Sequence, residues 1–433
     1  MSRSVRRVAL GLALLLGLAA LAMVGGVLAD RAEDLRVDTP PAGADPAQVQ
    51  RGRYLAQVGH CAGCHTARGG AAYAGGRPIA TPFGTVFTPN LTADPQSGLG
   101  RWSPQAFRRA LREGRSADGR ALLPACPYPN FSLVEAGDAD DLFAFLRSLP
   151  VQQRPRQPHA LRFPYGTAPA LAVWRAVHFR PAQMPPGLTD PVQRRGAYLV
   201  GGLGHCSACH GRYDRWGANG GAWDLRGGAI PGQGWVAPAL DRADQAGLGG
   251  WSPAEGVELL RSGRNAHAGV SGPMALVVAH STQHYDESDL QAVVAFLRAL
   301  PATSEAAPAS TREPGPTPVP PDASTLQQGE RLYSDHCRDC HGRDGQGVSD
   351  DGPALRGNRA LALASPDNVI RMVVGGGFLP ATAAQPMPAG MPPFATRLGD
   401  EEIAAVVSFI RWRWGDQAPA VTRLDVNRQR GGD

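Results

Sequence analysis

Lysine is absent from this sequence, and aromatic residues make up only 6% of it. All 43 basic residues are arginine, and against 38 acidic residues they leave a mild net charge of +5. No basic run is interleaved with aromatic residues, so nothing indicates nucleic-acid binding. No carboxylate pair, nucleophile–base arrangement, nucleotide loop, or molybdenum or flavin motif stands out either. Substrate chemistry carried by the side chains of this chain is therefore not expected.

Glycine and proline, by contrast, are abundant, with 54 and 39 copies. This composition predicts short helices joined by long loops. At 433 residues the chain is long enough for two to four domains.

Six of the seven cysteines form three copies of the motif C-x-x-C-H, the attachment signature of c-type haem. The two thiolates reach the two vinyl groups of one haem, and the adjacent histidine faces the iron as the proximal ligand. A redox disulfide or half of a zinc site is the alternative for a single C-x-x-C. Three copies, each with its own histidine and none with a second C-x-x-C nearby, favour three covalently bound haem c groups, which would also supply apolar core. The predicted attachment residues are Cys61, Cys64, Cys206, Cys209, Cys337 and Cys340, and the predicted proximal ligands are His65, His210 and His341.

The N-terminus indicates export. Three arginines precede an uncharged run from Val8 to Ala29, which is long enough to span a bilayer. The arginines would stay in the cytoplasm and deliver everything after Asp30 to the far side. Because Val27-Leu28-Ala29 also looks like a cleavage site, residues 1–30 are either a signal peptide or a transmembrane anchor, and the length of the run favours the anchor.

The haem motifs lie in a frame that occurs three times. A short helical segment leads into each motif. Downstream, the segment 98–116 matches the segment 247–265, and 365–377 is a shorter equivalent. Each contains Ser-Pro followed by residues with an apolar helical period, which predicts a helix with Ser at the N-cap and Pro at the first helical position. A second helix with acidic residues at its start and arginine near its end closes each repeat, at 138–150, 286–301 and 398–415.

This frame resembles class I cytochrome c, and the resemblance covers all three repeats. We therefore expect an all-α fold of three tandem class I cytochrome c domains, each wrapped around one haem, after the N-terminal apolar helix. The predicted segments are 1–30 signal peptide or anchor, 43–150 domain 1, 151–190 connector, 191–302 domain 2, 303–323 Pro-rich linker, 324–416 domain 3 and 417–433 polar tail. Within the connector, residues 170–179 carry an apolar helical period that suits either packing on the chain's own domain or docking of a partner.

A six-coordinate electron-transfer haem needs a second axial ligand, usually Met in this fold, in the loop before the last helix. The second repeat offers Met274. The third offers Met387 and Met391, and we prefer Met391 because the sequence MPPF follows it. A Met that serves only to fill the core is the alternative reading, but a loop position between Pro and Gly disfavours it.

The first repeat has no Met between residues 24 and 183. Cys126, the one cysteine outside the three C-x-x-C-H motifs, follows His65 by about the same distance at which the Met ligands follow their histidines, so it is the predicted sixth ligand of the first haem. An anionic thiolate stabilises Fe(III) over Fe(II) and would lower the potential of this haem. The alternatives are an unligated Cys126 with a five-coordinate iron, or ligation by His60 or His159.

With TPFGTVFTPNLTADPQSGLGRWSP and PACPYPNF in its first repeat, the chain resembles the membrane-bound tri-haem cytochrome c subunits of bacterial dehydrogenases. The resemblance implies a periplasmic electron-transfer subunit at the inner membrane. Its partner would be a dehydrogenase catalytic subunit of the quinoprotein, flavin or molybdenum type, and it would pass electrons to ubiquinone or a terminal oxidase. Relatives usually read PAMPYP where this chain has Cys126, and several anchor through a C-terminal amphipathic segment that is missing here.

Two other functions compete with electron transfer. One is a self-standing haem enzyme of the thiosulfate dehydrogenase or peroxidase kind, which would use a His/Cys-ligated or open first haem. The other is a redox or gas sensor with Cys126 as a displaceable ligand, but the sequence contains no output domain. Because each haem has a candidate sixth ligand, electron transfer is the preferred function.

Overall fold

The structure is a computed structural model that describes residues 33–38, 43, 45–241, 247–300, 319–348 and 352–430, together with Gly11, Gly17 and Gly25. The predicted signal peptide or anchor lies outside these residues apart from the three glycines, and so does most of the predicted 303–323 linker. Within the described part of the chain, no helix has the length and apolar character needed to cross a membrane.

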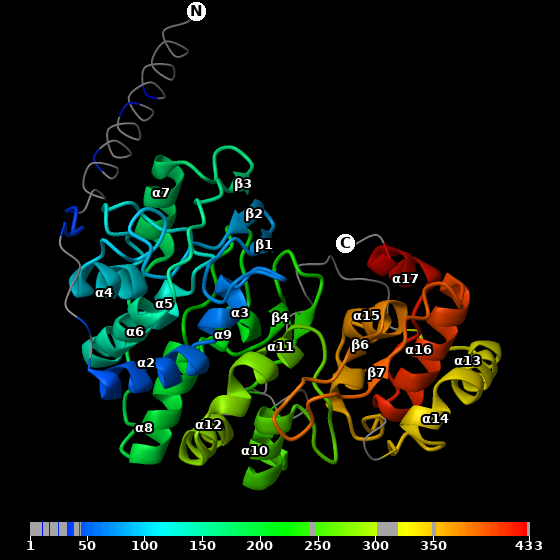
Figure 1. Cartoon of the computed structure of the whole chain (residues 1–433). Coiled ribbons are helices and arrows are strands. Elements are labelled where there is room, and N and C mark those ends of the chain that lie inside the picture. Colours follow the sequence, from blue (N-terminus) through cyan, green and yellow to red (C-terminus); the bar gives the residue numbers. More distant parts are fainter. Residues whose placement is uncertain are drawn as a thin grey trace, which may run out of the picture. The chain divides into compact units, whose positions relative to one another are not determined.

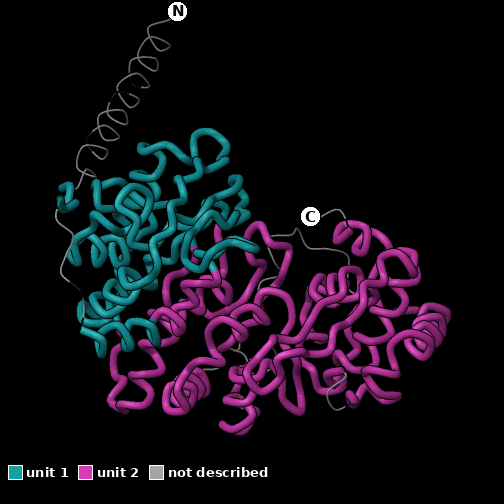
Figure 2. The backbone as a smooth tube through the Cα atoms, in the orientation of Figure 1, with its two compact units in different colours: residues 1–55, 64–183, 215–218 teal, residues 56–63, 184–214, 219–433 magenta. Residues whose placement is uncertain are grey.

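The chain divides into two compact units (Figure 2). Unit 1 holds residues 1–55, 64–183 and 215–218, and unit 2 holds residues 56–63, 184–214 and 219–433. Helices form the framework of both (Figure 1), as the sequence predicts. The all-α prediction is incomplete, however, because three small antiparallel sheets lie between the helices. Their strands are two to four residues long, as expected where loops rich in glycine and proline turn back on themselves.

Unit 1 contains most of the helix that leads into the first haem motif, and the last two residues of that motif, Cys64 and His65. Its elements are α2 (Pro46–Val58, whose last three residues belong to unit 2), α3 (Cys61–His65, whose first three residues belong to unit 2), β1 (Pro78–Thr81), β2 (Gly84–Phe87), α4 (Pro104–Glu113), α5 (Tyr128–Phe131), α6 (Ala136–Ser148), β3 (Ala160–Leu161) and α7 (Ala168–His178). The strands form one sheet in the order β1-β2-β3.

Unit 2 contains the other two motifs. Its first part holds α8 (Pro191–Ala197), the π-helix η1 (Tyr198–Leu203), α9 (Ser207–His210), β4 (Gly228–Ala229), β5 (Val236–Ala237), η2 (Leu248–Gly250), α10 (Pro253–Ser262), α11 (Pro273–His280), η3 (Thr282–His284) and α12 (Glu287–Ala299). Its second part holds α13 (Ala323–His336), α14 (Arg338–His341), η4 (Arg359–Ala362), α15 (Asp367–Gly375), β6 (Gly377–Phe378), β7 (Gly390–Met391), α16 (Asp400–Trp414) and α17 (Arg423–Arg430).

One helix crossing occurs three times, at α2 with α6, α8 with α12, and α13 with α16. In each, a glycine of the first helix faces a backbone carbonyl and an aromatic side chain of the second, so closely that a Cβ on the glycine would overlap both. Only glycine lets two helix backbones approach to this distance. The three sets are Gly52 with Asp141 and Phe145, Gly196 with Ala292 and Phe296, and Gly329 with Ala405 and Phe409.

Ion pairs accompany the first two crossings. Arg51 precedes Gly52 and pairs with Asp141 at 2.7 Å, and Arg195 precedes Gly196 and pairs with Asp289 at 2.7 Å. In each pair the aspartate is largely buried while the arginine keeps contact with solvent, which lowers the desolvation cost of the pair.

The predicted Ser-Pro helix starts are confirmed twice. Ser103 caps α4 through its side chain, and Ser252 caps α10 in a complete capping box with Glu255. The third start is different, because α15 begins at Asp367 with Pro366 as its N-cap. Ser365 nevertheless accepts a hydrogen bond from the Asp367 amide at 3.2 Å. The serine therefore still satisfies a free backbone donor at that helix end.

The segment predicted as a polar tail contains a helix that belongs to the core of unit 2. Val426 of α17 is fully buried against the cluster that includes Ile403 and Val407. At the end of the helix, Arg430 pairs with Asp400 at 2.5 Å and donates to the backbone oxygen of Leu398 at 2.7 Å. The segment is polar on average, so the sequence did not indicate that Val426 and Arg430 attach this helix to the core.

Candidate haem-binding sites

Each C-x-x-C-H motif forms a short helical turn directly after the helix that leads into it. The turns are α3 for the first motif, α9 for the second and α14 for the third. A single turn brings the two cysteines and the histidine of a motif onto neighbouring positions, which is the spacing that thioether attachment of one haem needs.

The three predicted proximal histidines have the same hydrogen bond. His65, His210 and His341 place Nδ1 at 2.9, 2.7 and 2.9 Å from the backbone oxygen of a proline. Because a carbonyl oxygen can only accept, Nδ1 carries the proton in each ring. This bond holds the ring in one orientation and leaves Nε2 with a free lone pair for a metal.

The protonation state of these histidines also suits metal binding. Burial lowers the pKa of all three imidazoles, since the charged form loses its hydration, while the hydrogen bond to the proline acts in the opposite direction. The neutral imidazole, the form that ligates iron, is therefore favoured at neutral pH.

The acceptor prolines are functional residues that sequence reasoning did not identify. They are Pro89, Pro238 and Pro353, and they lie 24, 28 and 12 residues beyond their histidines. A signal was available, because each belongs to a Pro-x-Leu triplet: PNL, PAL and PAL. Because the triplets lie at different distances from their histidines, they were not recognised as part of the repeat.

Glycine residues complete the same side of each site. The backbone oxygen of each motif histidine accepts a hydrogen bond from a glycine amide, at 2.7 Å for Gly75, 2.7 Å for Gly227 and 2.8 Å for Gly347. All three glycines have left-handed φ angles of 73°, 70° and 80°. A Cβ there would collide with the backbone near the acceptor proline. These positions therefore require glycine, and they bring the acceptor proline next to the histidine.

The cysteines suit covalent attachment better than the alternatives. All seven are free thiols, so the C-x-x-C pairs do not form disulfides here. Within the described residues, no group of three or more His, Cys, Asp or Glu side chains is placed to hold a metal ion. Burial raises the pKa of Cys64, and it raises the pKa of Cys206 and Cys337 to about 12. The residues present thus fit haem c: paired thiols, an oriented neutral histidine and a glycine-lined turn.

The structure separates the candidate methionines. Met274 lies at the start of α11 and is half-buried, two residues after Gly272, whose φ is 54° and which packs against the ring of Trp235. Met391 lies in β7, pairs with Gly377 and packs against the buried core of the third repeat. Met387 is 91% exposed. These positions favour Met391 over Met387 as an iron ligand.

Cys126 is half-buried in the loop before α5. Burial, and to a smaller extent repulsion from the Cys64 thiolate, together raise the pKa of its thiol to about 12. The structure thus brings the seventh cysteine close to an attachment cysteine of the first motif, 62 positions away in the chain. Burial thus favours the neutral thiol over the thiolate at Cys126.

The alternative ligands of the first haem have other contacts. His159 accepts a hydrogen bond at Nδ1 from the Phe87 amide at 3.1 Å. His60 belongs to the segment 56–63 of unit 2, where its ring centroid lies 6.0 Å from that of His280. Neither arrangement favours these histidines over Cys126.

Comparison with known proteins identifies the class to which these sites belong. The cytochrome c family model matches residues 49–150 and 326–414. The cytochrome c subunit of the quinone alcohol dehydrogenase of Gluconobacter oxydans is 37% identical over 89% of this chain and 83% of its own length. The gluconate 2-dehydrogenase cytochrome c subunit of Pantoea cypripedii is 38% identical over 88% and 89%, and the fructose dehydrogenase cytochrome subunit of Gluconobacter japonicus is 31% identical over 90% and 84%.

The chain therefore belongs to the family of dehydrogenase cytochrome c subunits. Membership implies covalently bound haem c and supports electron transfer within an oxidoreductase complex. The self-standing haem enzyme considered above gains no support from these relatives.

Proposed function

We propose that this chain is a three-haem electron-transfer subunit. It takes electrons from the catalytic subunit of a periplasmic dehydrogenase, of quinoprotein, flavin or molybdenum type, and passes them to ubiquinone or a terminal acceptor. The observation that carries the proposal is the proximal geometry, which occurs at all three motifs: a histidine held by a proline carbonyl at 2.7–2.9 Å beside a left-handed glycine. When bound, each haem supplies a one-electron Fe(III)/Fe(II) couple.

The residues of each site have distinct roles in this proposal. The paired cysteines would attach the haem, and the proximal histidine would bind its iron. Met274 and Met391 would serve as the second ligands of the second and third haems, which would close them to substrate and leave outer-sphere electron transfer as their chemistry. The residues that would serve are Cys61, Cys64 and His65; Cys206, Cys209, His210 and Met274; and Cys337, Cys340, His341 and Met391.

Cys126 would complete the first iron as a thiolate. Ferric iron would reverse the effect of burial on this thiol, because the cation stabilises the anionic form that burial disfavours. The proximity of Cys126 to Cys64 supports this role. Since a thiolate favours Fe(III), the first haem would have the lowest potential of the three, within a range of about 0.8 V that axial ligands can cover.

The body of the chain would lie on the periplasmic side of the bacterial inner membrane. The support is the apolar run at residues 8–29 behind three arginines, which would export the chain and either anchor it or be removed. The three relatives compared above are each named as the cytochrome subunit of a dehydrogenase, which supports a dehydrogenase as the electron donor.

The first test of this function is a haem count with a reduction assay. We expect three haems per chain, with one lost in each variant whose two motif cysteines are replaced by Ala. Substrate should reduce the haems only when the dehydrogenase catalytic subunit is present. Turnover of thiosulfate or peroxide by the isolated chain would overturn the electron-transfer role.

The second test concerns Cys126. Low-temperature EPR of the ferric protein should show a low-spin thiolate signal that is absent from Cys126→Met and Cys126→Ser. A redox titration of Cys126→Met should show one of three potentials raised and the other two unchanged. Unaltered spectra in both variants would make Cys126 a bystander. High-spin iron in the wild type would mean an open first haem and would favour a catalytic role.

A further inference from the structure

Helix α7 has an unusual orientation in unit 1. Its arginine points inward: Arg175 is only 9% exposed, donates Nη1 to the backbone oxygen of Glu113 at 2.7 Å, and lies 5.5 and 4.9 Å from the ring centroids of Tyr128 and Phe179. A helix that faced only water would place this charge outward and its aliphatic residues inward.

The outward surface of α7 is apolar instead. Val173 is 47% exposed and Val177 is 60% exposed, and the exposed Pro169 and Ala176 lie on the same side at helical spacing. At the edge of this surface Trp174 donates Nε1 to the backbone oxygen of Trp216, which is itself 49% exposed. We call this surface the α7 face: Pro169, Val173, Ala176, Val177 and Trp216. Phe163, which precedes the helix in sequence, is 88% exposed.

The charges around the α7 face are all positive within its own stretch of chain. Residues 151–189 contain five arginines and no aspartate or glutamate. Arg162 and Arg180, which flank the helix in sequence, are both exposed, and Arg215 lies over the ring of Trp216 at 5.3 Å. The exposed Asp214 directly precedes Arg215 in the chain, so arginine is in excess but acid is present. Aliphatic residues, exposed aromatic residues and an excess of arginine over acids are the composition of helices that lie in the interface of an anionic bilayer.

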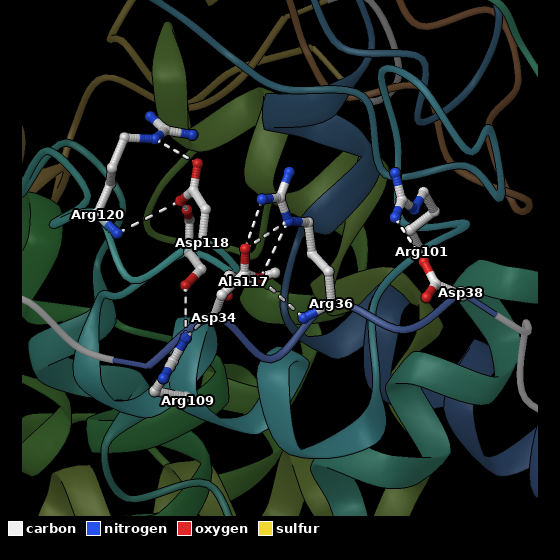
Figure 3. Close-up of polar contacts among 9 residues, drawn as sticks. Asp34, Arg36, Asp38, Arg101, Arg109, Ala117, Asp118 and Arg120 are labelled. Carbon is white, nitrogen blue, oxygen red and sulfur yellow. Dashed lines mark hydrogen bonds and ion pairs between the residues drawn. The ribbon is translucent and has the colours of Figure 1, made fainter.

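The N-terminal segment ties unit 1 to the end of the apolar run. Leu35 donates its amide to the backbone oxygen of Ala117 at 2.8 Å, and Val37 donates to Arg101 at 2.9 Å. We call residues 34–38 the strap. Figure 3 shows it: Asp34 pairs with Arg36, and Asp38 pairs with Arg101 at 2.8 Å. Leu35 is six positions beyond Ala29 in the chain, so the strap lies within about 20 Å of the end of the run, even with the chain fully extended.

The strap and α7 both contact the loop that follows α4, whose last residue is Glu113. Leu35 binds this loop at Ala117, and Arg175 of α7 binds its start at Glu113, four residues earlier, or at most about 14 Å along the chain. An anchored N-terminus would thus keep the α7 face within reach of the bilayer surface.

We propose that the α7 face lies in the headgroup interface of an anionic phospholipid bilayer and, with the strap, sets the orientation of unit 1 at the membrane. The tether argument rests on the proposed membrane anchor, whereas the apolar face and its arginines do not. Neutral detergent or zwitterionic lipid would satisfy the apolar residues only, and anionic headgroups would also satisfy the arginines.

Lipid crosslinking on the full chain tests this. The holoprotein would be reconstituted in nanodiscs of phosphatidylethanolamine and phosphatidylglycerol with a trace of diazirine-bearing phosphatidylglycerol, photolysed, and mapped by mass spectrometry. We expect adducts in the peptide 163–175 and in the peptide that begins at residue 176. Adducts should be several-fold fewer in nanodiscs of phosphatidylcholine alone.

Two variants separate the face from general charge effects. Val173→Glu/Val177→Glu should lower the α7 adducts by on the order of tenfold, because two carboxylates would have to enter an anionic interface. Val151→Glu is the matched control: it is in the same unit, is 54% exposed and lies outside the helix, and its adducts should equal those of the wild type. Both variants should retain the wild-type haem content and absorption spectrum.

The same map distinguishes the failure of this inference from the failure of the anchor. Adducts in residues 8–29 without adducts at α7 would overturn the α7 proposal and leave the anchor intact. Adducts at α7 alone would support the proposal and argue that the N-terminal segment does not anchor the chain. Protection of α7 only by the bound dehydrogenase subunit, without lipid adducts, would overturn the proposal in favour of protein docking.

Discussion

Replacement of Gly52 by Ala tests the helix crossing that supports the first haem site. A Cβ at Gly52 would lie 2.5 Å from the carbonyl carbon of Asp141 and 2.8 Å from the Cβ of Phe145, where ordinary contacts are 3.4–4 Å. Helix α2 would therefore have to move away from α6 by about 1 Å. Overpacking of this severity costs up to about 3 kcal/mol, and the better helix propensity of Ala returns about 1 kcal/mol. We expect a net loss of about 2 kcal/mol.

Hydrogen exchange of the holoprotein measures this loss where it arises. A loss of about 2 kcal/mol corresponds to about 30-fold faster exchange of the protected amides in α2 and α6. Gly137→Ala is the control, because Gly137 also lies in α6 but a Cβ there would meet nothing within 4 Å. Its exchange should be unchanged or slower. Wild-type exchange rates in Gly52→Ala, or equal acceleration in both variants, would refute the steric argument.

Three further predictions concern unit 2. Met391→Leu should abolish the sulfur-to-iron charge-transfer band of one haem, whereas Met387→Leu, at an exposed position, should leave the absorption spectrum unchanged; the reverse result would exchange their roles. Ser252→Ala should cost about 1 kcal/mol in the free energy of unfolding. Hydrogen bonds from Ser252 hold the pKa of Glu255 below its ordinary 4.5, so the stability that this carboxylate contributes is full above pH 4.5 and is lost as the pH falls through the lower folded-state pKa. The unfolding temperature of Ser252→Ala should therefore depend less on pH in this range than that of the wild type. An equal pH dependence would contradict the cap. Arg411→Met should cost about 2 kcal/mol by denaturant unfolding, because Arg411 is 2% exposed and donates to two buried backbone carbonyls; wild-type stability would contradict this.

Much of the fold was predictable because it is written in local patterns. The Ser-Pro starts of α4 and α10 depend on a side chain that bonds an amide three residues away, so a short sequence suffices to recognise them. The later start of α15 shows the limit: Ser365 still binds an amide, but the helix begins after Pro366. The π-helix η1 and the docked α17 were not anticipated, since each depends on packing against distant residues.

Some residues of the candidate sites were also predictable from local sequence, and others were not. Sequence alone identifies the residues that would bind haem covalently, because thioether chemistry needs two cysteines and a histidine at a fixed local spacing. It also identifies Cys126 as the residue in the position of a missing Met. It could not identify Pro89 or its two counterparts, since their distances from the histidines vary from 12 to 28 residues.

Sequence by itself thus predicted the attachment chemistry and the threefold frame, and it identified the family that the comparisons support. Tertiary structure decided which of two methionines is half-buried and which is exposed, which carbonyl orients each histidine, and which side of α7 faces outward. The physical reason is how far apart in the sequence the interacting residues lie. Covalent attachment and helix capping act over a few residues, whereas burial and the second hydrogen bond of an imidazole depend on whatever the folded chain brings next to them. An apolar period shows that α7 has two unlike sides, but only the inward contacts of Arg175 show that the apolar side is the exposed one.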